Sequence, residues 1–166
     1  MKNLFFTSWV GLFLVIFYQE IGAQQNIVTL NQCELMKQWV GKWQRVNNPK
    51  DSIYFLEVKE YKKAFIAEDY YTINGVKNDL GTWSFGFSKK EDKFMIFGLR
   101  PGGNYVTRIC WFENEKKLIQ HQVLNFDPEK LIFKIEMTFD SPKSWTGVFL
   151  NKNGVVTSET KFVKVE

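Results

Sequence analysis

Few side chains in this 166-residue chain could carry chemistry. The single histidine, His121, excludes a multi-histidine metal site. The two cysteines, Cys33 and Cys110, are too far apart for a zinc-binding motif. The chain also has no Gly-x-Ser-x-Gly turn and no phosphate-binding glycine loop. We therefore expect neither a metal nor any other cofactor.

The catalytic groups that remain are an acid and a tyrosine. Glu68 or Asp69, paired with a tyrosine in an apolar cup, would suit a small barrel isomerase or cyclase, because such reactions need only one or two polar groups. The same two acids are typical of a solvated strand end. Catalysis is therefore the alternative hypothesis, and the leading one requires no enzyme.

Composition favours one all-β domain. Aromatic residues make up 17% of the chain, and bulky flat side chains at that density favour strands over helical bundles. The length fits a single domain. The net charge of +4 is mild, and the lysines fall mainly in turns or beside acids, so we expect no nucleic-acid partner.

The N-terminus reads as a secretory signal peptide. A basic start, an apolar run at residues 4–18 and the small residues Gly22 and Ala23 match that pattern. The run is shorter than the ~20 residues that span a bilayer. We predict a signal peptide at 1–23, a mature domain at 24–166 and a secreted or periplasmic protein. We expect a monomer without a stable membrane anchor.

The rest of the chain alternates short apolar runs with turn residues. Apolar spacing over residues 30–40 predicts one short helix. The predicted strands lie at residues 42–46, 52–58, 65–73, 80–87, 94–99, 105–112, 118–126, 131–139, 145–150 and 155–165. Hairpin-length links predict an antiparallel up-and-down meander, which avoids exposed edges by closing into an eight- to ten-stranded barrel.

Gly41-Lys42-Trp43, at the end of the predicted helix, resembles the Gly-x-Trp signature of lipocalins and the wider calycin group. The resemblance implies that Trp43 closes the barrel base and that the barrel is a cup for a small molecule. It is strongest for small exported bacterial lipocalin-like proteins. Where lipocalins place an arginine near the C-terminus, only Lys161 and Lys164 are present. Fatty-acid-binding proteins are disfavoured because only residues 47–51 separate the first two strands.

The two cysteines leave two possibilities open. An even number of cysteines in an exported chain allows a disulfide between Cys33 and Cys110. Alternatively both are buried thiols, since Cys110 lies within an apolar run.

Side-chain alternation predicts the inner wall of the barrel. Taking each hairpin loop as four residues long, and anchoring the pattern on residues 131–139, we assign one face of five strands to the interior. The candidate ligand-binding residues are Trp43, Trp83, Phe85, Ile96, Tyr105, Thr107, Ile109, Gln120, Gln122, Leu124, Phe133, Ile135 and Met137.

The same arithmetic places Arg108 opposite His121 on the outer face. If the loop around Pro128 has an odd number of residues, both point inward as a carboxylate-binding couple.

The leading hypothesis is an exported protein that holds an apolar or amphipathic small molecule in a barrel cavity. The alternatives are the isomerase or cyclase, and a barrel filled by its own side chains that acts as a structural or interaction module.

Overall fold

The computed structural model describes residues 29–165. The predicted signal peptide at 1–23 lies outside the described residues, so its cleavage and the export of the chain stay predictions.

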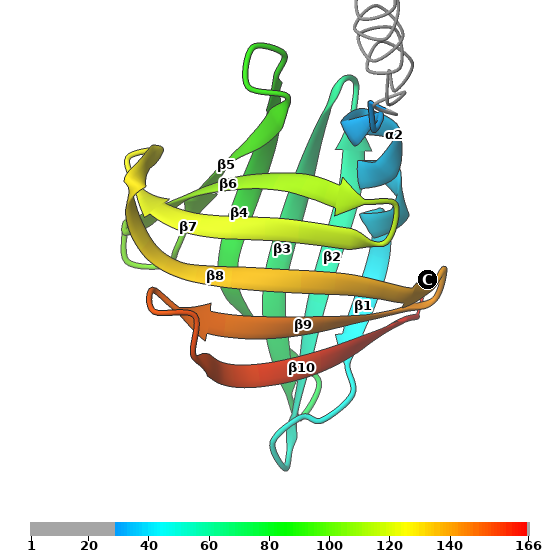
Figure 1. The fold of residues 1–166 in the computed structure, drawn as a ribbon. Coiled ribbons are helices and arrows are strands. Elements are labelled where there is room, and N and C mark those ends of the chain that lie inside the picture. Colours follow the sequence, from blue (N-terminus) through cyan, green and yellow to red (C-terminus); the bar gives the residue numbers. More distant parts are fainter. Residues whose placement is uncertain (1–28, 166) are drawn as a thin grey trace, which may run out of the picture.

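The described residues form an antiparallel meander of strands closed into one barrel (Figure 1). The strands are β1 (Gly41–Arg45), β2 (Ser52–Tyr61), β3 (Ala64–Ile73), β4 (Val76–Ser88), β5 (Lys93–Leu99), β6 (Tyr105–Asn114), β7 (Lys117–Leu124), β8 (Asp127–Ser141), β9 (Ser144–Asn151) and β10 (Val156–Lys164). Each strand pairs with its sequence neighbours, and β1 pairs with β10. The predicted all-β fold is confirmed, at the upper end of the predicted strand number.

A short helix covers one end of the barrel. It comprises α2 (Gln32–Met36) and the 3-10 turn η1 (Lys37–Trp39). The Asn31 side chain accepts a hydrogen bond from the Glu34 amide and so caps α2. The Gln32 side chain fixes the helix to β6, since it accepts from the Phe112 amide at 2.7 Å and donates to the Phe112 carbonyl at 3.1 Å.

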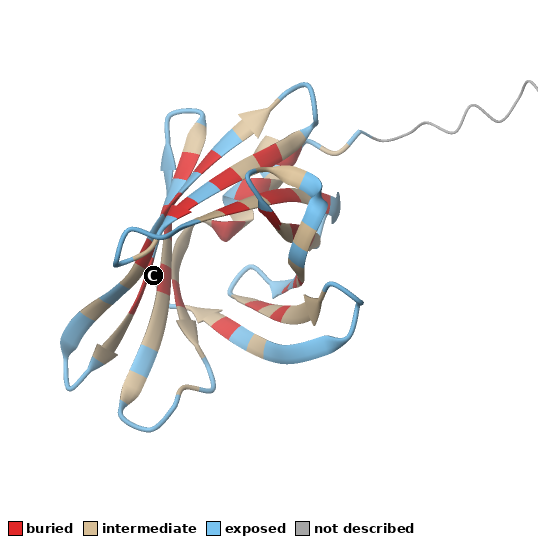
Figure 2. Cartoon of the chain, turned by 90° about the vertical axis from the view of Figure 1, so that its left-hand side faces the viewer, coloured by how far each residue is buried: buried red, intermediate tan, exposed pale blue. Residues whose placement is uncertain are grey.

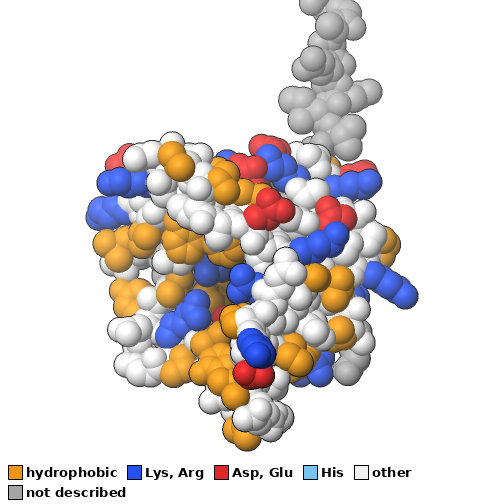
Figure 3. Space-filling view, turned by 90° about the horizontal axis from the view of Figure 1, so that it is seen from below, with side chains coloured by type: hydrophobic (Ala, Val, Ile, Leu, Met, Phe, Trp, Pro, Cys, Tyr) orange, Lys and Arg blue, Asp and Glu red, His pale blue; other side chains and the backbone are white. Residues whose placement is uncertain are grey.

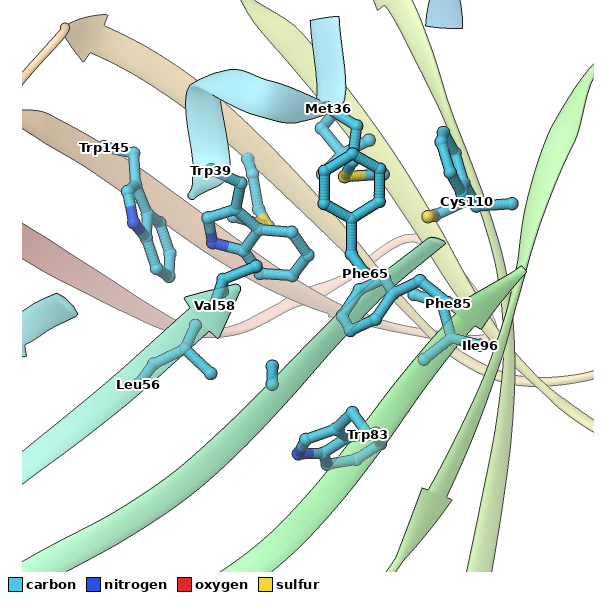
Figure 4. Close-up of a cluster of buried hydrophobic side chains, with 14 of the residues drawn as sticks. Met36, Trp39, Leu56, Val58, Phe65, Trp83, Phe85, Ile96, Cys110 and Trp145 are labelled. Carbon is cyan, nitrogen blue, oxygen red and sulfur yellow. The ribbon is translucent and has the colours of Figure 1, made fainter. Parts of the chain in front are cut away.

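The end under α2 is packed with aromatic and aliphatic side chains. Buried positions gather in this half of the barrel (Figure 2). Met36 and Trp39 come down from the helix onto strand residues such as Val58 and Phe65 (Figure 4). Trp43 is fully buried and donates its indole N–H to the Trp39 carbonyl at 2.8 Å. This half of the barrel is a conventional core.

Lys164 lies beside Trp43 where β10 meets β1. Its Nζ lies 5.3 Å from the centre of the Trp43 ring and donates to the Val40 carbonyl at 2.6 Å. One ammonium group thus joins β10, the β1 indole and the backbone after η1 at the closure of the barrel.

Three of the four hairpins that join β4 to β8 differ from the predicted four-residue loops, the one between β6 and β7 through a bulge after Phe112. The link between β5 and β6 contains five residues, because Leu99 pairs with Tyr105 and the turn is made by Gly102 and Gly103 at positive φ. The link between β7 and β8 turns at Asn125 and Phe126, both also at positive φ, so Pro128 lies within β8.

The five-residue loop inverts β6 relative to the prediction. Ile96 pairs with Arg108 and Phe94 pairs with Cys110, so Arg108 and Cys110 face inward. The prediction that Tyr105, Thr107 and Ile109 face inward is therefore wrong. A bulge after Phe112 inverts the pattern again, so that the predicted inner face of β7 is correct for the wrong reason.

The two cysteines are free thiols in the structure. Cys110 is buried, and burial raises the pKa of its thiol. Cys33 is partly buried, and burial followed by the neighbouring Glu34 raises its pKa too. Of the two possibilities, the structure presents the unbridged one.

Lys164→Met tests the closure of the barrel. The methionine keeps the apolar stem but removes the donor to Val40 and the charge over Trp43. We expect the free energy of unfolding to fall by about 1–2 kcal/mol in urea denaturation. Lys161→Met, on the exposed face of the same strand, serves as the control and should change it by less than about 0.5 kcal/mol. Equal effects of the two substitutions would contradict the role of Lys164.

Candidate functional site

The barrel is hollow on the side away from α2. A cavity of about 280 Å³ lies between its walls. Seen from below the view of Figure 1, the surface is hollowed, and Lys or Arg side chains lie within the hollow beside hydrophobic ones (Figure 3). The barrel is therefore not filled by its own side chains along its whole length.

Much of the cavity wall is apolar. Its apolar lining residues are Trp39, Leu56, Ala67, Trp83, Phe85, Ile96, Ile135, Met137, Trp145, Phe149 and Phe162. Trp145 stacks on Phe162 with ring centres 4.0 Å apart, which makes one wall flat and aromatic.

Asp69 is the one carboxylate that lines the cavity, and three donors hold it. Its Oδ1 accepts the Trp83 indole N–H at 2.9 Å. Its Oδ2 accepts the Tyr54 hydroxyl at 3.1 Å and faces the Arg100 guanidinium at 3.5 Å. Burial, followed by the Asp69 charge, raises the pKa of Tyr54, so its hydroxyl stays protonated.

Trp83 lies flat against the backbone of β5 because its cross-strand partner is Gly98. A Cβ at Gly98 would stand 2.3 Å from two carbons of the Trp83 ring. Gly98 leaves room for the Trp83 ring, and Asp69 accepts the hydrogen bond of its indole N–H. Two arginine side chains lie against this ring. The Arg108 guanidinium lies 4.4 Å from the ring centre and that of Arg100 lies 4.8 Å from it.

Arg108 has no ion-pair partner among the described residues. It donates from Nη1 to the Gln120 side-chain oxygen at 3.2 Å, and its Nε is buried without a hydrogen-bond partner. Burial, followed by repulsion from Arg100, lowers the pKa of Arg108 to about 10, so the group is still charged at neutral pH.

The wall across the barrel carries a second set of donors. The lining residues Arg45, Thr160, Trp39 and Trp145 each have a buried nitrogen or oxygen with no hydrogen-bond partner among the described residues. Arg45 lies on β1 and Arg108 on β6, which are separated by four strands in either direction around the ring. Residues with unsatisfied buried polar atoms therefore line the cavity on opposite sides.

The structure brings together about half of the predicted binding residues. Those that line the cavity are Trp83, Phe85, Ile96, Gln120, Ile135 and Met137. Trp43 lies in the core beneath the cavity, and Phe133 packs against that core. Gln122 is in register with Arg108 but does not line the cavity.

Four predicted binding residues lie elsewhere. Tyr105, Thr107 and Ile109 are on the outer face of β6, where the Tyr105 hydroxyl donates to Asn125 and the Thr107 hydroxyl donates to the Val123 carbonyl. Leu124 is half exposed beside the narrow turn at Asn125. The three β6 positions follow from the loop length that the prediction misjudged, and that of Leu124 follows from the irregular pairing of β7 with β8 after Gln122.

The pairing of Arg108 with His121 is also wrong. Arg108 faces the cavity, whereas His121 packs its ring against Trp111 on the outside, with ring centres 4.9 Å apart. Burial, followed by Lys134 and Lys93, lowers the pKa of His121. The alternative hypothesis, in which Arg108 and His121 both point inward, is therefore correct for Arg108 and wrong for His121.

Sequence reasoning missed Tyr54, Arg45 and Arg100 as lining residues. The five-residue loop that contains Gly102 and Gly103 was the available signal for Arg108. A five-residue loop with both glycines in the turn inverts the faces of β6 and places a charged residue inside. No comparable signal marks Arg45, the last residue of β1, or Arg100, the first residue after β5.

Among residues 29–165, no cluster of His, Cys, Asp and Glu side chains could hold a metal ion, and no helix is long and apolar enough to cross a membrane. No family model and no curated protein matches the chain.

Gly98→Ala tests the seat of Trp83. The new methyl group must displace the ring and break its bond to Asp69, so we expect the free energy of unfolding to fall by about 1–3 kcal/mol. Gly86→Ala, on the exposed face of β4 with no atom within 4 Å of the added carbon, is the control and should be neutral. Urea denaturation measures both, and a neutral Gly98→Ala would contradict the contact.

Proposed function

We propose that this protein binds an apolar or amphipathic small molecule in the barrel cavity. The observation that supports the proposal most directly is the cavity of about 280 Å³ with an aromatic and aliphatic lining. Ligand sites in proteins are mostly such concave apolar spaces with a few fixed polar groups. The donors on Arg108, Arg45 and Thr160 are polar groups of this kind.

The cavity is small for a ligand site. Its volume of about 280 Å³ lies just below the roughly 300–1,000 Å³ of most ligand pockets. This size favours a compact ligand of up to about three rings, or a short chain, over a long lipid.

We further propose that the protein is an exported, lipocalin-like member of the calycin group. The closed meander, the Gly41-Lys42-Trp43 sequence and the cation of Lys164 over Trp43 support the likeness, and the apolar run at residues 4–18 supports export. The short link at residues 46–51 between β1 and β2 has no room for the helix pair of fatty-acid-binding proteins.

The catalytic alternative has one observation in its favour. Tyr54 and Asp69 both line the cavity and are hydrogen bonded, which is the acid and tyrosine pair that an isomerase or cyclase would need. Glu68, the other candidate acid, lies on the outer face in an ion pair with Lys77.

The bonds within this pair favour binding over catalysis. Tyr54 directs its proton to Asp69 and not into the cavity, and both Asp69 oxygens are already engaged by donors. A general acid or base must instead reach the proton of its substrate. We therefore assign the pair to fixing Trp83 and Arg100.

Ile135→Trp tests binding in the cavity. Ile135 lines the cavity on β8, and an indole there would fill space that a ligand needs. We expect phenylnaphthylamine, an uncharged apolar dye that fluoresces when bound, to lose at least about tenfold in affinity.

Ile132→Trp is the matched control, because Ile132 lies on the same strand but is half exposed on the outer face. It should leave dye affinity unchanged. A dye that ignores Ile135→Trp, or that does not bind the parent protein, would refute the proposed function.

A further inference from the structure

Every buried side-chain nitrogen or oxygen that lacks a hydrogen-bond partner in the described residues belongs to a residue lining one cavity. These atoms are the Nε of Arg45 and Arg108, the indole Nε1 of Trp39 and Trp145, and the Oγ1 of Thr160. Buried polar groups in folded proteins are normally satisfied, since each orphan costs free energy. Their concentration here indicates that the cavity is built to meet a polar ligand.

The chemistry of these atoms specifies that ligand. Four of the five are N–H groups that only donate, and the fifth is a hydroxyl that can donate. A ligand that satisfies these donors must supply hydrogen-bond acceptors, and oxygen is the most common acceptor atom in small organic molecules. The wall therefore selects for an oxygen-rich group.

The charges along the wall point to an anion. Three guanidinium groups, those of Arg45, Arg100 and Arg108, line the cavity against the single carboxylate of Asp69. Asp69 is already shared among Arg100, Tyr54 and Trp83. Among residues 29–165, Arg45 and Arg108 therefore have no carboxylate partner, in a space with mostly apolar walls where an unpaired charge is unfavourable.

Arg108 is the better placed of these two cations. Gln120, which is 1% exposed, fixes its Nη1, and the Trp83 ring supports its face. The planar guanidinium is thereby held in one orientation, and its buried Nε–H has no hydrogen-bond partner among the described residues. A fixed guanidinium edge is the group that binds a carboxylate through two parallel hydrogen bonds.

We propose that the cavity binds a compact amphipathic organic acid whose anionic group is held by Arg108. The apolar body of this acid packs among Ile135, Phe149 and Trp145, and an acceptor atom on it reaches the donors of the opposite wall. This inference rests on the proposed function and adds the charge and polarity of the ligand.

Two dyes with the same rings separate the inference from the proposed function. Anilinonaphthalene sulfonate carries an anionic group, and phenylnaphthylamine is the same ring system without it. We expect the parent protein to bind the sulfonate at least tenfold more tightly, by fluorescence titration. Equal affinities would overturn the inference and leave the proposed function standing, whereas binding of neither dye would overturn both.

Arg108→Met locates the anionic group. We expect the sulfonate dye to lose about 10- to 100-fold in affinity, and the uncharged dye to change by less than threefold. Arg108→Lys keeps the charge but not the two-pronged edge, and should fall between the parent and Arg108→Met. Loss of both dyes in equal measure, or of neither, would overturn the assignment to Arg108.

Lys93→Met is the matched control, because Lys93 lies 4.4 Å from the centre of the Trp111 ring on the outside of the barrel. This substitution also removes a cation that lies over a tryptophan ring, and it should leave the affinities for both dyes unchanged. A loss of sulfonate binding there as large as in Arg108→Met would show that net charge, and not the cavity, attracts the dye.

Urea denaturation distinguishes a ligand-binding role of Arg108 from a structural one. Removing an uncompensated buried cation should leave the midpoint of unfolding unchanged or raised. A clear fall in that midpoint for Arg108→Met, with sulfonate affinity kept in Arg108→Lys, would assign Arg108 to the fold and overturn the proposal.

Discussion

Pairing of β1 with β10 is the constraint on which the rest of the structure depends. It closes the sheet at ten strands, and a barrel of this circumference is wider than the roughly eight-stranded barrel that side chains just fill. The aromatic side chains brought by α2, η1 and the strand ends fill one half. The other half has no such plug and holds the cavity. Closure thus divides one domain into a core that stabilises it and a space that can receive a ligand.

The polar groups inside the barrel follow from the same division. Asp69 gathers Tyr54, Trp83 and Arg100 into one network, in which each donor has an acceptor. Gly98 lets the Trp83 ring lie against β5, and the ring in turn supports Arg108. The position of Arg108 thus depends on the Trp83 ring, and the position of that ring depends on the absence of a side chain at Gly98. This dependence makes Asp69 and Gly98 positioning residues for Arg108, and of the two only Asp69 also lines the cavity.

The architecture was predictable from the sequence because it depends on patterns that many residues share. Alternation along each strand and turn residues between strands predicted the meander, and the apolar spacing at residues 30–40 predicted the helix. The faces were harder, because a single residue more or less in a loop inverts every following side chain. The loop at Arg100 had one residue more than assumed, and the bulge after Phe112 restored the parity. An error confined to β6 thus removed Tyr105 and Ile109 from the wall and concealed Arg108.

The inversion of β6 also changes the physical character of the cavity. With Thr107 and Ile109 inside, the wall would be apolar with a few neutral polar points, and any apolar molecule of the right size would fit equally well. With Arg108 inside, an apolar ligand leaves a guanidinium edge and the Arg45 edge without acceptors, while an organic acid satisfies the first and neutralises its charge. Discrimination by unsatisfied polar groups is stronger than discrimination by shape alone. The strand that the sequence orients least reliably is therefore the one that decides whether this wall of the cavity carries a charge.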